Sequence, residues 1–133
     1  MLEHEQWLAL AELDYKSAKS LFKDDLFSTS TFHCQQAAEK YLKGYLCFKG
    51  EQITKTHDLV KSLEQCMKFD KDFQKLYSAI RALNPFATRS RYPSEFDIPD
   101  LNDAKLAIKQ AESVMNFVMK KISESIVGQM EIR

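Results

Sequence analysis

Histidines and arginines are the residues of this sequence best suited to acid–base chemistry on an anionic substrate. The histidines are His4, His33 and His57, and the first arginine in the chain is Arg81. A histidine side chain titrates near neutral pH and can transfer a proton, whereas a guanidinium group holds a phosphate. Because every arginine follows all three histidines, a site that uses both types must be assembled by the fold from distant segments.

One pole of a helical bundle could assemble such a site. If successive helices alternate in direction, the end of the second helix, the start of the third, the end of the fourth and the loop after it lie together. Unpaired N–H groups at the start of the third helix would add positive potential for a phosphate. The binding residues that we expect at this pole are Lys55, His57, Arg81, Arg89, Arg91 and Tyr92, with Lys49 beside them.

Each of these residues also has a purely structural interpretation. Arg89 and Arg91 could instead pair with Glu95, Asp97 or Asp100 and fix the loop. Tyr92 could pack with its hydroxyl bonded locally, and His57 could anchor the chain before the third helix. No catalytic residue is therefore assigned from the sequence.

The second helix carries a polar group that allows two interpretations. Its members are Gln35, Gln36, Glu39, Lys40 and Lys43. They could form a solvated face with an i,i+4 pair between Glu39 and Lys43, or they could line a dimer cleft or a docking surface for a partner. His33 has no second histidine or cysteine at ligand spacing, so we expect no metal site and no cofactor.

The elements that would position these residues are long helices. Apolar residues recur at spacings of three and four, and all three prolines lie between positions 85 and 99. The predicted helices are residues 3–23, 29–48, a third that begins after Thr56 as its N-cap, 71–84 and 102–126. An ordered, proline-containing loop is predicted over 85–100 and a frayed tail over 127–133. The expected fold is an all-α, up-and-down bundle of four or five helices over residues 1–126.

The bulk properties fit one globular domain that stays in the cytoplasm. Lysine plus arginine and aspartate plus glutamate both number 19, so net charge gives no general attraction to nucleic acid or lipid. No apolar run is long enough to span a membrane, and the first residues lack the pattern of a signal peptide. The three cysteines have no CxxC spacing, and we expect buried, reduced thiols.

Three segments and the first helix resemble the HEPN domain family. The segments are FHCQQAAEKYLKGYL at residues 32–46, KTHDL at 55–59 and RYP at 91–93. Trp7 followed by A-x-x-D-Y-x-x-A is similar to the opening of that family, and the likeness covers about residues 3–122. The resemblance implies a helical bundle that forms homodimers, binds nucleotides, and is often paired with a minimal nucleotidyltransferase in two-component systems that include toxin–antitoxin pairs.

The ribonuclease branch of that family uses an arginine followed four to six residues later by histidine, and this sequence has no such motif. We therefore expect a homodimeric component that binds a nucleotide or a partner protein. One alternative is a metal-independent ribonuclease toxin in which Arg89 or Arg91 holds the phosphate and His57 transfers the proton. Another is a helical scaffold without a ligand. The missing motif favours a protein that is not an enzyme.

Overall fold

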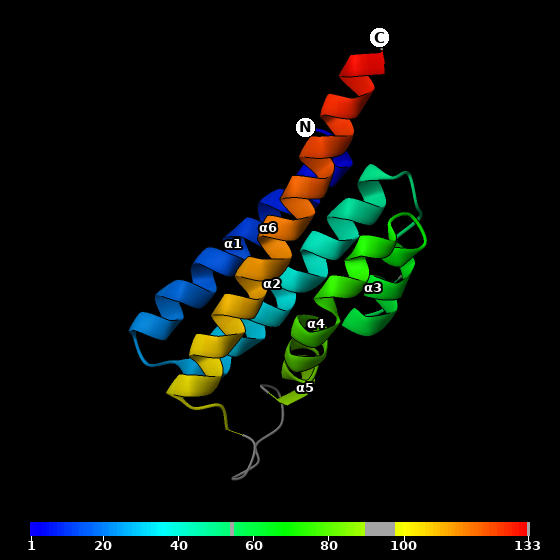
Figure 1. The fold of residues 1–133 in the computed structure, drawn as a ribbon. Coiled ribbons are helices and arrows are strands. Elements are labelled where there is room, and N and C mark those ends of the chain that lie inside the picture. The colour runs from blue at the N-terminus through cyan, green and yellow to red at the C-terminus, as the bar shows by residue number, and fades with distance from the viewer. Residues whose placement is uncertain (54, 90–97, 133) are drawn as a thin grey trace.

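The structure is a computed structural model that describes residues 1–53, 55–89 and 98–132. Figure 1 shows a bundle in which two long helices and a longer C-terminal helix pack along one another. All the secondary structure in the described residues is helical, so the all-α prediction is confirmed. The elements are α1 (Glu3–Lys23), α2 (Phe27–Phe48), α3 (Leu59–Met67), the 3-10 helix η1 (Lys71–Leu76), α4 (Tyr77–Leu83), α5 (Phe86–Arg89) and α6 (Leu101–Ile132).

Helices α1 and α2 form a hairpin closed by a short turn. Asp25 has a φ of 60°, a left-handed conformation that aspartate tolerates better than most residues. The Ser30 hydroxyl donates to the Ala18 carbonyl oxygen at 2.7 Å and joins the two helices. At the far end of the hairpin, a Cβ atom on Gly44 would lie 2.8 Å from the Leu8 Cδ2 atom. The absence of a side chain at Gly44 therefore lets the helices approach closely.

The connection after α2 departs from the alternating order that the sequence predicted. Gly50, with a φ of 79°, follows the end of α2, and the chain then returns along that helix. As a result His57 contacts Glu39 in the middle of α2, while the Cys66 thiol lies 3.7 Å from the Leu42 carbonyl oxygen. These two contacts show that α3 runs in the same direction as α2.

The residue that caps the N-terminus of α3 is not the one that the sequence predicted. The prediction placed the N-cap at Thr56, but the N-cap is Asp58, whose side chain accepts a hydrogen bond from the Val60 N–H at 2.9 Å. The Thr56 hydroxyl oxygen instead accepts from the Asp58 N–H at 3.1 Å. Both side chains therefore order the last residues of the loop before the helix begins.

The segment predicted as one helix over 71–84 is divided. Asp70 caps η1 by accepting from the Asp72 N–H at 2.9 Å, and α4 then continues to Leu83. Pro85 follows Asn84, and the short helix α5 lies within the stretch that the sequence predicted as a loop. The rest of that stretch, residues 90–97, lies outside the described residues, including Arg91 and Tyr92.

Helix α6 is longer than predicted at its C-terminal end. Asp100 and Asp103 each accept a hydrogen bond from the other's backbone N–H, at 2.8 and 3.0 Å, and fix the start of the helix. The helix continues to Ile132, through the residues predicted to be a frayed tail. Figure 1 shows this end of α6 projecting past the N-terminus of α1.

The core lies around α2, which packs against α1, α3 and α6. Its aromatic centre joins three elements: the Phe73 ring lies 4.4 Å from the Tyr45 ring and 4.9 Å from the Phe117 ring, measured between centroids. Ala11, Ala18, Ala37 and Ala38 are fully buried and permit close helix packing. Within the described part of the chain, no helix is long and apolar enough to cross a membrane.

Candidate functional site

The polar residues of α2 form the candidate site, which we call the α2 polar face. It comprises Gln35, Gln36, Glu39, Lys40 and Lys43. Gln35, Glu39 and Lys43 are buried, so the interpretation as a solvated face is wrong for these three. Gln36 and Lys40 are half-buried. Buried polar groups require partners, and the partners come from other segments of the chain.

Glu39 lies at the centre of the first group of partners. One of its carboxylate oxygens lies 3.1 Å from the His57 Nδ1 atom, and the other lies 3.4 Å from the Lys43 Nζ atom. In the tautomer that carries its proton on Nδ1, the His57 ring donates to this carboxylate. The His57 side chain is 71% exposed, so most of the imidazole ring faces solvent.

The backbone around His57 is held by α2 and by the end of α4. The Gln35 side chain donates to the His57 carbonyl oxygen at 3.5 Å. The Asn84 side chain accepts from the Leu59 N–H at 2.9 Å and donates to the Asp58 carboxylate at 3.2 Å. The start of α3 and the end of α4 therefore meet, as the sequence predicted.

These same contacts correct one expectation about the pole. The sequence suggested unpaired N–H groups at the start of α3, ready for a phosphate. The Leu59 and Val60 N–H groups instead donate to Asn84 and Asp58. A carboxylate already occupies the place where an anion would bind, so the helix start adds little positive potential.

The other predicted pole residues are only partly brought together. Lys55 is exposed in the loop before α3, and the exposed Arg81 guanidinium lies 4.8 Å from the centre of the Tyr77 ring. Lys49 follows Glu39 by ten residues of the same helix, about 15 Å along its axis, so it does not belong to the pole. Arg89 ends α5, but its side chain, like all of Arg91 and Tyr92, lies outside what the structure describes.

A second network joins α1 to the α2 polar face and was missed from the sequence. The carboxylate of the buried Asp14 lies 2.8 Å from His33 Nδ1 and 2.5 Å from Lys40 Nζ. The available signal was an acidic residue at the edge of the apolar stripe of α1, within A-x-x-D-Y-x-x-A. Burial of a charge requires a counter-ion, which could have been sought on the neighbouring helix.

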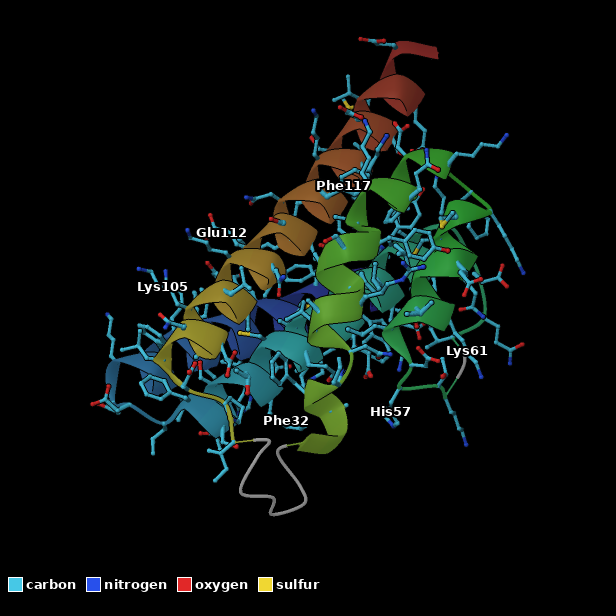
Figure 2. The ribbon with its side chains drawn as sticks, turned by 60° about the horizontal axis from the view of Figure 1, so that its bottom comes forward. Phe32, His57, Lys61, Lys105, Glu112 and Phe117 are labelled. Carbon is cyan, nitrogen blue, oxygen red and sulfur yellow. The ribbon has the colours of Figure 1, made fainter. Side chains whose placement is uncertain are left out.

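Exposed leucines lie next to this polar network on α1. Leu10 and Leu13 are exposed, and they lie four residues and one residue before Asp14. In Figure 2, His57 and Phe32 lie toward the end of the bundle that carries α5. The exposed apolar side chains of α1 thus lie close to the Asp14–His33–Lys40 network.

The cysteines and acidic residues do not extend this site. Burial raises the pKa of the Cys34 thiol to about 12 and raises the pKa of Cys66 further, so both are unreactive at neutral pH. The described residues contain no group of three or more histidine, cysteine, aspartate or glutamate side chains placed to hold a metal ion.

Comparison with models of protein families shows which family this chain belongs to. The family model described as HEPN domain matches residues 4–122, which is most of the sequence. The chain belongs to the HEPN family. The resemblance expected from residues 32–46, 55–59 and 91–93 is thereby confirmed.

Two solved structures share this HEPN fold. TT1696 from Thermus thermophilus is 22% identical over 91% of this chain and 99% of its own, with a TM-score of 0.77. ST0689, described as an archaeal HEPN homologue, is 26% identical over 92% of this chain and 99% of its own, with a TM-score of 0.75. A comparison with curated proteins gives no match.

Proposed function

We propose that this HEPN protein is a homodimeric binding component of a two-component system whose partner is a minimal nucleotidyltransferase. The observation that supports binding of a protein is the α2 polar face, where fixed buried charges lie beside exposed leucines of α1. Nucleotide binding at the pole has less support, because the N–H groups at the start of α3 are already paired within the protein.

Co-purification tests this proposal directly. The chain is expressed together with a candidate nucleotidyltransferase, and the complex is measured by light scattering and titration calorimetry. Leu13→Glu should weaken the complex by roughly tenfold or more, because a charge would be desolvated in the contact. Leu106→Glu is the matched control, since Leu13 and Leu106 are 61% and 55% exposed and lie on different helices. Equal affinity of both variants and wild type would contradict the proposed surface.

Nucleotide titrations separate the remaining interpretations. A binding component should hold its partner with or without added ATP or GTP. Saturable binding of either nucleotide that His57→Ala abolishes would instead favour the pole as a nucleotide site. If titrations with ATP and GTP show no binding and co-purification recovers no partner, the interpretation as a helical scaffold without a ligand is favoured.

The ribonuclease alternative is favoured by one observation, the pairing of His57 with Glu39. A carboxylate that orients an exposed imidazole is the arrangement of a general base. If this site cleaves RNA, expression of wild type should arrest growth and His57→Ala should relieve the arrest. His4→Ala is the control, because the His4 ring packs against Phe48 and lies outside the α2 polar face. A wild type that neither arrests growth nor cleaves RNA excludes this activity.

A further inference from the structure

A groove between α1 and α6 contains a pocket with Tyr41 of α2 at its base. The pocket has a volume of about 690 Å³, which lies within the range of sites for small molecules. Leu8 and Ala9 line it from α1, and Met115 and Met119 line it from α6. Figure 1 shows these two helices side by side along the bundle. The pocket therefore presents an apolar lining to any molecule that enters it.

Tyr41 brings a polar atom without a partner to this pocket. The residue is only 2% exposed, and its hydroxyl forms no hydrogen bond with another described residue. Gln65 Oε1 is the one fully enclosed side-chain polar atom without a partner in the described part of the chain, so the Tyr41 oxygen is not sealed inside the protein. Its open side is the pocket that Tyr41 lines. Because buried hydroxyls normally have partners, this one is suited to a bound molecule.

The Tyr41 hydroxyl would act as a hydrogen-bond donor. Burial raises the pKa of Tyr41 to about 12, and the negative charge of Glu12 contributes in the same direction. The hydroxyl therefore keeps its proton at neutral pH. The proton of the neighbouring Tyr15 hydroxyl is already donated to the Glu112 carboxylate at 2.9 Å. Tyr41 thus suits an oxygen acceptor on a bound molecule, such as a carbonyl group.

Lysines surround one end of the groove. Beyond Lys19 the groove continues into a hollow of about 350 Å³ whose apolar lining includes Phe22 and Ile108. Lysines four residues apart on one helix repel each other, and two such pairs face this hollow. None of the four forms an ion pair with another described residue; they are Lys19, Lys23, Lys105 and Lys109. An anion in the hollow would relieve this repulsion.

The acidic side chains of the groove give an anionic molecule one orientation. Glu12 lines the pocket, but its charge is balanced by Lys16, whose Nζ atom lies 3.1 Å from the Glu12 carboxylate. Glu5 lines the pocket nearer the start of α1 and would repel a second carboxylate there. The acidic group of a bound molecule is therefore directed toward the lysine end.

We propose that this groove binds a small organic acid whose carboxylate lies among the four lysines and whose apolar body fills the pocket, with an oxygen atom of that body accepting from Tyr41. Lys19 follows Tyr15 by four residues, about 6 Å along α1, so a short carbon chain spans the two positions. An inorganic anion would use only the lysines, and a neutral apolar molecule would use only the pocket. The proposal goes beyond the proposed function, because this site needs neither the partner protein nor the α2 polar face.

Titration calorimetry of the full chain with three matched probes tests the site. The probes are γ-benzoylbutyrate, δ-phenylvalerate, in which a methylene replaces the ketone, and phenylbutylamine, in which an ammonium group replaces the carboxylate. Benzoylbutyrate should bind saturably and roughly threefold or more tighter than phenylvalerate, because only the ketone accepts from Tyr41. Phenylbutylamine should bind roughly tenfold or more weakly than phenylvalerate, because its charge has the same sign as the lysines.

Variants assign each part of the proposed contact. Tyr41→Phe should remove the difference between the two acids and leave the fold intact, since no hydrogen bond within the protein is lost. The double variant Lys19→Met and Lys23→Met should weaken both acids by roughly tenfold. Lys61→Met is the matched control, because Lys61 is exposed on α3 and lies on the other side of the molecule from Lys105 (Figure 2). Ala9→Trp should abolish binding by filling the pocket from an exposed position.

Four results would overturn the inference. They are no saturable binding of benzoylbutyrate, equal affinity for the acids and the amine, a ketone preference that persists in Tyr41→Phe, and an effect of Lys61→Met as large as that of the double variant. Loss of probe binding as the chain self-associates at higher concentration would also overturn it, because a second copy would then cover the groove. These titrations contain no partner protein, so their failure leaves the proposed function untouched.

Discussion

Replacing Glu39 with glutamine should lower the stability of the protein far more than the same change at Glu12. Both glutamates form an i,i+4 ion pair with a lysine, Glu39 with Lys43 and Glu12 with Lys16. The side chains of the first pair are 5% and 6% exposed, and those of the second are 58% and 71% exposed. The two pairs thus share their sequence spacing and differ in burial.

The expected magnitudes follow from that difference. Glutamine at position 39 leaves the Lys43 ammonium group buried without its anion, which costs about 3 kcal/mol of unfolding free energy. We choose the low end of the usual range because glutamine still accepts a hydrogen bond and Lys43 keeps the Trp7 ring at 5.7 Å. Glu12→Gln should cost less than about 0.5 kcal/mol, since water replaces an exposed partner.

Urea unfolding followed by circular dichroism measures both changes. A loss of about 3 kcal/mol corresponds to a fall in melting temperature of roughly 10 °C for a chain of this size. A double-mutant cycle with Lys43→Met should return a coupling energy of about 2 kcal/mol, because removing both charges leaves neither one unpaired. Equal costs at positions 39 and 12, or a coupling energy near zero, would refute the reasoning from burial.

Two further experiments test the core, one by chemical labelling and one by substitution. Burial raises the pKa values of the Cys34 and Cys66 thiols, so both should stay protonated and resist alkylation by iodoacetamide from pH 7 to pH 9. Mass spectrometry should find Cys47 modified first. Its labelling should still be slower than that of a free cysteine, because burial and Glu3 raise the pKa of the Cys47 thiol. Rapid labelling of Cys34 in the native protein would contradict the packing. Gly44→Val should lower the unfolding free energy by about 2 kcal/mol, because a side chain there displaces Leu8, and an unchanged urea midpoint would show that α1 and α2 can separate freely.

Local sequence patterns predicted the helices well where residues of the helix itself determine where it begins and ends. The first helix has the predicted bounds, and α2 begins two residues before the predicted start and ends where predicted. Apolar spacing identifies the buried side of such helices because it repeats over five or six turns. The caps were predicted less well, since Thr56 and Asp58 are both capable caps and the choice depends on the position of Asn84.

The polar residues of α2 show where local patterns were insufficient. Gln35, Glu39 and Lys43 have the composition of a solvated surface, yet they are buried because the segment before α3 returns along α2 and because Trp7 covers Lys43. Asp14 gave a weaker signal, a charge beside an apolar stripe. Its partners on α2 could be found only once the α1–α2 hairpin fixed their distance.

The sequence by itself determined that the chain is helical, that its cysteines lie among apolar residues and that it lacks the Arg-to-His motif of ribonuclease relatives. These features depend on neighbours within a few turns or on the order of residues, so they can be read locally. Only the tertiary structure decided that α3 runs parallel to α2, that His57 pairs with Glu39, and that α1 and α6 form a groove with lysines at one end. Those arrangements depend on where the described residues before α3 lie against α2 and on how helices far apart in the chain pack together. No local pattern specifies either one.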